Sequence, residues 1–108
     1  MMKKNGSQSA YINDQTISTI RQLAWTGQHA PAIDSATQAL ATPKIKPADQ
    51  ISLLDLRSES YIAIGNLDLA MKDAKAMMKL ANPVGATRES PLLKVQALNR
   101  LALVQMRT

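Results

Sequence analysis

Few side chains in this chain could support catalytic chemistry. His29 is the only histidine and there is no cysteine, so a cysteine nucleophile paired with a histidine base is excluded. His29 lies in a turn between Gly27 and Pro31; we interpret it as a surface turn residue, with a lone ligand or base as the alternative. Catalysis needs several such groups in fixed geometry, and no Gly-rich phosphate loop is present. We therefore predict that the chain is not an enzyme.

Two carboxylates could in principle hold a metal ion or a proton. Asp55 and Glu59 are four residues apart, which places them on one face of a helix. Hard cations need several oxygen ligands, and the sequence suggests no further ligand to join this pair. We interpret the two residues as a solvated helix face, and we expect no catalytic residue, no cofactor and no metal site.

Three lysines form the other chemically distinct group. Lys72, Lys75 and Lys79 lie at offsets of 0, 3 and 7, on one side of a predicted helix, where they could contact phosphates. No aromatic residue alternates with them, which argues against stacking on bases. The net charge of +5 does not by itself indicate a nucleic-acid partner. We interpret the lysines as a solvated outer face, with nucleic-acid binding as the less favoured alternative.

The composition favours closely packed helices in a single domain. The chain has 108 residues, of which 45% are hydrophobic but only 3% aromatic, so the core must consist of Ala, Leu, Ile and Met. Alanine lets helix backbones approach closely and is the best helix former. The lack of cysteine is compatible with a cytoplasmic location, and no apolar run approaches the ~20 residues needed to span a bilayer. We expect a cytoplasmic protein without a membrane partner.

The stretch from Pro47 to Pro83 carries two apolar stripes with the helical period. The first stripe contains Ile51, Leu54, Ser58 and Tyr61, and the second contains Leu67, Ala70, Met71, Ala74, Met77, Met78 and Ala81. Pro47 suits the first turn of a helix. Gly65, between the stripes, can take the left-handed conformation that ends a helix. The stretch therefore predicts a helical hairpin.

Three more helices are expected around this hairpin. The first begins between Ser9 and Asp14 and ends near Thr26, the second spans Pro31 to Leu40, and the fifth runs from Ser90 to the end of the chain. Their expected inward residues are Ile17, Ile20, Leu23 and Ala24; Ala32, Ile33, Ala36, Ala39 and Leu40; and Leu92, Val95, Leu98, Leu101, Ala102 and Gln105. Residues 1–8 are expected to be flexible, and residues 42–46 and 82–89 to be linkers.

The order of residues in the hairpin resembles a tetratricopeptide repeat (TPR): Tyr61, the turn glycine Gly65, then Ala70 and Ala74, with Pro83 closing. Gly27 and Gly65 are 38 residues apart, and the same offset relates Ala32 to Ala70 and Ala36 to Ala74. An offset of 44 relates Leu54 to Leu98 and Ser58 to Ala102. Both offsets exceed the usual repeat length of about 34 residues, and the extra residues fall in the linkers.

This resemblance implies an all-α fold of about five helices: a right-handed stack of antiparallel helical hairpins that forms a TPR-like superhelix. The expected domain is residues 9–108. The resemblance covers roughly residues 13–108 of it, as about two and a half repeats at residues 13–42, 47–83 and 90–108. In the TPR family the first helix of each pair lines a concave groove in which partners lie. The groove residues implied here are Asp14, Ile17, Arg21 and Trp25; Ser52, Asp55, Glu59 and Ile62; and Gln96, Asn99, Leu103 and Arg107.

The implied groove mixes both charges with Trp25 and would suit a short peptide or helix; packing beneath the N-terminal segment is an equal alternative for Trp25. The branch of the family that binds chaperones holds a terminal carboxylate with lysine, asparagine and arginine. Here the corresponding positions carry Ile17, Arg21 and Asp55, and only Asn99 fits, so that branch is not favoured.

Three functions follow as hypotheses. The first is a non-catalytic protein–protein interaction module that binds a peptide or helix in the groove. The second is an internal fragment of a larger bacterial signalling regulator, a transcription activator or nucleotide cyclase, in which the array couples domains. In that case the outer face of the fifth helix, at Ala97, Leu101 and Val104, would lack its covering helix and could mediate a homodimer. The third is nucleic-acid binding by the lysine face.

Overall fold

The computed structural model describes residues 14–81 and 90–107, and every regular element in that part of the chain is an α-helix. The helices are α2 (Asp14–Trp25), α3 (His29–Leu40), α4 (Pro47–Ala63), α5 (Leu67–Ala81) and α6 (Ser90–Arg107). The predicted all-α class is thus confirmed. The expectations for the flexible segment 1–8, for the start of the first helix before residue 14, and for the loop 82–89 lie outside the described residues.

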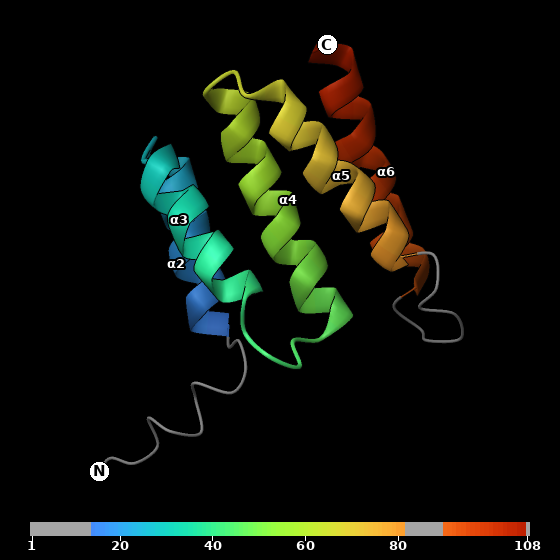
Figure 1. The fold of residues 1–108 in the computed structure, drawn as a ribbon, viewed down its shortest axis with the longest axis horizontal. Coiled ribbons are helices and arrows are strands. Elements are labelled where there is room, and N and C mark those ends of the chain that lie inside the picture. The colour runs from blue at the N-terminus through green and yellow to red at the C-terminus, as the bar shows by residue number, and fades with distance from the viewer. Residues whose placement is uncertain (1–13, 82–89, 108) are drawn as a thin grey trace.

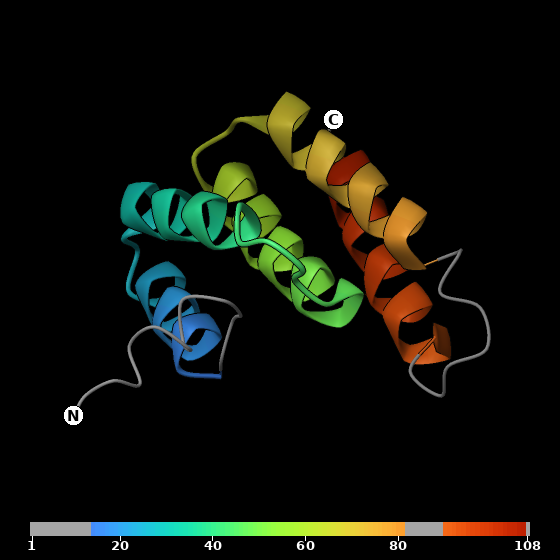
Figure 2. The same cartoon turned by 60° about the horizontal axis from the view of Figure 1, so that its bottom comes forward.

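The helices lie around α4. Each helix packs against the next along the chain, and α4 also contacts α2 and α6. Figures 1 and 2 show α3 and α5 on one side of the molecule and α2 and α6 on the other, with α4 between the two pairs. Because α4 touches all the other described helices, its sequence has to serve more than one interface.

The two hairpin bends have the same geometry. Gly27 and Gly65 have φ values of +81° and +84°, in the left-handed region that favours glycine. In each bend the amide after the glycine donates to the carbonyl five residues earlier: Gln28 to Leu23 at 2.9 Å, and Asn66 to Tyr61 at 2.8 Å. This bond pattern is the Schellman motif, which satisfies carbonyls left free at a helix end. The 38-residue offset seen in the sequence therefore joins two turns of one kind.

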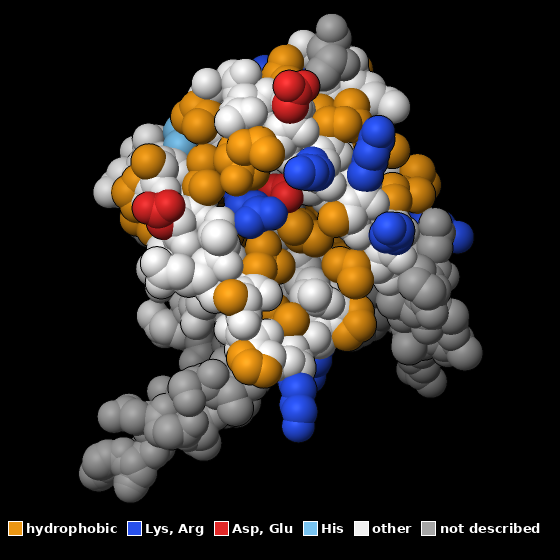
Figure 3. Space-filling view, in the orientation of Figure 1, with side chains coloured by type: hydrophobic (Ala, Val, Ile, Leu, Met, Phe, Trp, Pro, Cys, Tyr) orange, Lys and Arg blue, Asp and Glu red, His pale blue; other side chains and the backbone are white. Residues whose placement is uncertain are grey.

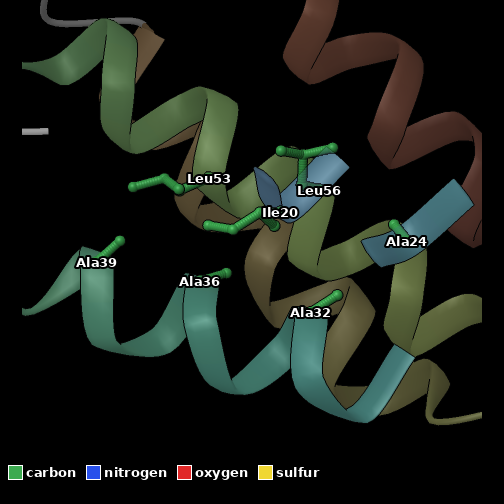
Figure 4. Close-up of a cluster of buried hydrophobic side chains, with 7 residues drawn as sticks. All are labelled: Ile20, Ala24, Ala32, Ala36, Ala39, Leu53 and Leu56. Carbon is green, nitrogen blue, oxygen red and sulfur yellow. The ribbon is translucent and has the colours of Figure 1, made fainter. Parts of the chain in front are cut away.

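On the α2–α3 side, α4 packs against small residues. Figure 4 shows Ala32, Ala36 and Ala39 of α3 directed toward Leu53 and Leu56 of α4. With Ile20 and Ala24 of α2, they form one buried cluster. Alanines in α3 leave room for the leucines of α4, so the helices interlock at close range. The predicted inward faces of α2 and α3 are confirmed, with Ile17, Leu23, Ile33 and Leu40 half-buried at their margins.

On the α5–α6 side, α4 contributes the stripe expected from the sequence. Ile51 and Leu54 pack with Met77, Ala81 and Ala97. Further along, Ala70, Ala74 and Val104 form a third cluster, bordered by Tyr61 and Met71. Tyr61 and Ala70 therefore face each other across the hairpin, as the two stripes predicted. The second buried face of α4, with Leu53, Leu56 and Ser60, was not predicted; it exists because α4 lies between two layers.

The predicted orientation of α6 is wrong. Val95, Leu98, Ala102 and Gln105 were expected inside but are exposed, whereas Ala97 and Val104, expected outside, are fully buried. Leu101 is half-buried, and the side chain of Leu92 lies outside the described residues. Apolar residues occur on every side of this helix, so their period does not choose a face. The small Ala97 allows close approach to α4 and α5, and polar contacts with α4 set the rotation of α6.

Candidate functional site

An open hollow lies between α4 and α6. It has a volume of about 310 Å³ and is lined by Glu59, Ile62, Ala63, Arg100, Leu103 and Arg107. Four of these, Glu59, Ile62, Leu103 and Arg107, were predicted from the sequence as groove residues. The structure thus brings together predicted residues from two helices that are separated by about forty positions in the chain.

An ion pair holds the two walls of this hollow. Arg100 donates from Nε to Oδ1 of Asp55 at 2.6 Å, and its Nη2 lies 4.0 Å from Oε1 of Glu59. Gln96 also donates from Nε2 to Oδ2 of Asp55 at 3.2 Å. Asp55 is half-buried, so the prediction that it belongs to a solvated face is wrong. Asp55 and Gln96, both predicted to contact a partner, instead join α4 to α6.

The charges that remain for a ligand come from opposite walls of the hollow, Glu59 from α4 and Arg107 from α6. Arg100 is 14% exposed and is compensated by Asp55. Glu59 is 46% exposed, and Arg107 is exposed in the last turn of α6, where a cation interacts favourably with the helix dipole. Ile62, Ala63 and Leu103 supply the apolar part of the same lining. This arrangement can hold an aliphatic side chain flanked by polar groups.

The other predicted groove residues do not line this hollow. Arg21 and Asn99 are exposed and Ser52 is half-buried, while Trp25 is 78% exposed. Ile17 packs at the edge of the α2–α3 cluster, and the side chain of Asp14 lies outside the described residues. Of the predicted groove, only the residues Glu59, Ile62, Leu103 and Arg107 of α4 and α6 line this hollow.

A second ion pair was missed by sequence reasoning. Arg57 of α4 donates from Nε to Oδ2 of Asp73 at 2.8 Å and from Nη2 to Oδ1 at 2.6 Å. Its Nη1 donates to Oγ1 of Thr37 at 3.0 Å, and its guanidinium lies 5.7 Å from the centre of the Tyr61 ring. The hydrogen bonds with Asp73 raise the pKa of Arg57 above its usual value, against the opposing effect of burial. Arg57 therefore connects α3, α4 and α5.

One signal in the sequence could have revealed this pair. Asp73 occurs between Ala70, Ala74 and Met77 on the inward stripe of α5. Only 5% of its side chain is exposed, and a buried carboxylate is almost always paired with a cation or hydrogen-bonded. An acid on an apolar helix face thus predicts a basic partner on the facing helix, although its spacing does not identify which one.

His29 differs from its prediction as a surface turn residue. It is the first residue of α3 and is half-buried. Its Nδ1 lies 3.1 Å from Oγ of Ser60 in α4, and Ser60 is fully buried. A nucleophile has to be reachable by its substrate, which this hydroxyl is not. We interpret the contact as a polar link between α3 and α4.

The lysine face lies on α5. Lys72, Lys75 and Lys79 are exposed, and together with Ala76 and Met78 they line a shallow hollow of about 560 Å³. Their predicted position on the outer side of the helix is thus confirmed. Across residues 14–81 and 90–107, no group of three or more His, Cys, Asp or Glu side chains is placed to hold a metal ion.

No protein-family model, curated protein or solved structure matches this chain. Within the described residues, no helix is long and apolar enough to cross a membrane. The side chains of the α4–α6 hollow and of the surfaces that flank it are therefore the features from which a function can be inferred.

Proposed function

We propose that this chain is a non-catalytic protein-interaction module of the TPR type, a right-handed stack of helical hairpins that binds a peptide or helix. The observation that carries the proposal is the open hollow between α4 and α6. Its lining includes Leu103 and Ile62 together with the exposed Glu59 and Arg107, so it combines apolar contact with two charges of opposite sign. Such a mixture recognises a peptide side chain and its neighbours.

The repeated bends support the repeat interpretation. Gly27 and Gly65 close two hairpins through the same hydrogen bonds, and the buried alanines Ala32 and Ala36 have counterparts in Ala70 and Ala74. A hairpin with one apolar face becomes stable by stacking on a neighbour. In such a stack α2, α4 and α6 would be the first helices of successive pairs, and the ligand would lie across them.

The walls of the hollow are held before any ligand arrives. Arg100, Asp55 and Gln96 join α6 to α4 through bonds of 2.6 and 3.2 Å. A surface that is already ordered loses less entropy on binding. The favoured ligand is an extended or helical peptide with one aliphatic residue for Leu103, flanked by an acidic residue near Arg107 and a basic residue near Glu59.

Selection from a displayed library of random peptides tests this function. Peptides enriched on the wild-type chain should bind at least about tenfold more weakly to a chain carrying Leu103→Asp, because a charge would replace the apolar centre of the hollow. Charge reversal by Arg107→Glu should select against acidic residues in the enriched sequences.

A matched control uses Gln38→Glu, which changes an exposed residue of α3, a helix that contributes nothing to the lining of the hollow. Circular dichroism should show that all three variants keep the helical content of the wild type. Peptides that bind the Leu103→Asp variant as tightly as the wild type would show that the hollow is not the binding site. Failure to enrich any peptide would count against the interaction function itself.

The other functions stay predictions. One observation supports a role in coupling the domains of a bacterial signalling regulator: one face of α6 is apolar and exposed. That face carries Val95, Leu98 and Met106 and not the expected Ala97, Leu101 and Val104. Nucleic-acid binding by the lysine face is tested by titration with an oligonucleotide at about 50 mM salt, where phosphate contacts are strong; no binding there would exclude it. The cytoplasmic location likewise stays a prediction.

A further inference from the structure

The side of α6 that points away from α4 carries an exposed apolar row. Val95 is 54% exposed, Leu98 48% and Met106 80%, and Ala102 is exposed between them. Spacings of three and four residues keep these four side chains on one face of the helix. We call this row the outer stripe. Contiguous exposed apolar surface of this kind marks interaction sites in folded proteins.

Lysines border the outer stripe on the side of α5. Met71 of α5 and Leu101 of α6 flank the same buried cluster, so these two helix faces meet. Lys75 lies one turn after Met71, and Lys94 lies one turn before Leu98; both lysines are exposed. The apolar row therefore has a basic margin where α5 and α6 adjoin.

Few acidic residues offset this margin among the described residues. The α6 sequence contains Lys94, Arg100 and Arg107 but no aspartate or glutamate. On the lysine face of α5 the single acidic residue is Asp68, four residues before Lys72. Figure 3 shows the Lys and Arg side chains over α5 interspersed with hydrophobic ones. An occupant of this surface would thus gain from apolar contact and from negative charge.

A second copy of the chain does not meet that requirement. The charged residues of α6 are all basic, so pairing two α6 helices in either direction brings no opposite charges together. Like charges across an interface disfavour association. A helix that presents carboxylates at the same margin would instead form pairs with Lys75 and Lys94.

We propose that the outer stripe of α6, with its lysine margin on α5, binds an amphipathic helix of another protein whose apolar face is flanked by Asp and Glu. Helices bind such surfaces through apolar residues spaced three and four apart. The charged margin sets the orientation of the helix and accelerates the encounter. This surface differs from the α4–α6 hollow and does not depend on the function proposed for it.

Fluorescence anisotropy with two designed peptides tests the proposal. Both have about the length of α6, 18 residues, and the same leucine stripe; one is flanked by glutamates and the other by lysines. The glutamate peptide should bind at least about tenfold more tightly than the lysine peptide, and added salt should reduce this difference, because exposed charge pairs are screened.

Variants locate the binding surface. Leu98→Gln combined with Met106→Gln should weaken binding of the glutamate peptide at least about tenfold, whereas Leu103→Gln, on the hollow side of the same helix, should leave it unchanged. Lys75→Glu combined with Lys94→Glu should reverse the preference between the two peptides. Circular dichroism establishes that each variant keeps its helices.

Several outcomes would overturn the proposal. Equal binding of the two peptides, or no binding of either, would remove the acidic-helix partner. Loss of binding through Leu103→Gln rather than through the outer-stripe variant would place the peptide in the hollow. Light scattering that shows a dimer, which the Leu98→Gln change dissociates, would assign the outer stripe to a second copy of this chain.

Discussion

The two sides of α4 are held by different forces. On the side of α2 and α3, Leu53 and Leu56 of α4 pack against the buried alanines of those two helices (Figure 4). Toward α5 and α6, apolar clusters are joined by two ion pairs, from Arg57 to Asp73 and from Asp55 to Arg100. Apolar packing depends on fit and hardly on direction. Ion pairs with short hydrogen bonds depend on direction, so they fix how α5 and α6 are rotated.

The largest effect is expected from a charge placed in either apolar layer. Ala36→Glu on one side and Ala74→Glu on the other should each cost more than about 4 kcal/mol, because an unpaired carboxylate would be buried, and both variants should be unfolded. Thermal melts followed by circular dichroism measure this. Gln38→Glu and Lys75→Glu, at exposed positions of the same helices, are the controls. An unchanged melting curve for Ala74→Glu would count against the stacked-hairpin interpretation.

Removal of Asp73 should have the next largest effect. Asp73→Ala leaves the guanidinium of Arg57, whose side chain is only 19% exposed, without its carboxylate. Breaking a buried pair in this way costs about 3–5 kcal/mol, and partial exposure of Arg57 favours the lower end. Urea unfolding measures the loss. The double variant Arg57→Met with Asp73→Leu should recover much of it, whereas equal instability of the single and double variants would mean that the pair is not the cause.

A smaller effect is expected at the other pair. Asp55→Ala removes the acceptor of Arg100 and Gln96, but Arg100 lines the open hollow and can turn toward water there. We expect a loss of about 1–2 kcal/mol, with faster amide hydrogen exchange in α6 than in α3. Ser52→Ala in the same helix serves as the control. Uniform acceleration in all helices would show that α6 does not move independently of the rest.

The smallest effect is expected for the polar link on the α2–α3 side. Replacing His29 by Ala removes its contact with Ser60, and a single hydrogen bond contributes about 0.5–1.5 kcal/mol. A shift in the urea midpoint without a change in slope would be the signature. A loss as large as that of Asp73→Ala would contradict the view that apolar packing dominates this side.

The sequence predicted where the helices lie along the chain better than which face of each helix is buried. The stripe of α5, from Ala70 to Ala81, was identified correctly because its outer positions are lysines that leave no other face to bury. The periodicity of α6 offered two apolar faces, and the choice between them depends on Ala97 and on the reach of Arg100 to Asp55. That contact joins residues 45 positions apart in the chain, so it appears only once the helices have been placed.

At the candidate site, too, the contacts between helices could not be predicted from the sequence. Glu59, Ile62, Leu103 and Arg107 were predicted to share a surface, and they line one hollow. Asp55 and Gln96 belong to the same set, yet they bond to α6 and α4 respectively. A polar residue on a helix face serves a ligand or a neighbouring helix depending on distances that spacing alone does not contain.

The linker between α3 and α4 has a further consequence. It is short, its tip Lys44 is exposed, and α4 remains joined to α5 and α6 by two ion pairs. Proteolytic cleavage at Lys44 would divide the molecule into an α2–α3 fragment and an α4–α6 fragment. Leu53 and Leu56 would then be exposed to solvent on the α4–α6 fragment. Because the alanine face of α3 fits those leucines, the two pieces should reassemble from solution, and the chain would serve as a split reporter whose signal is restored by complementation.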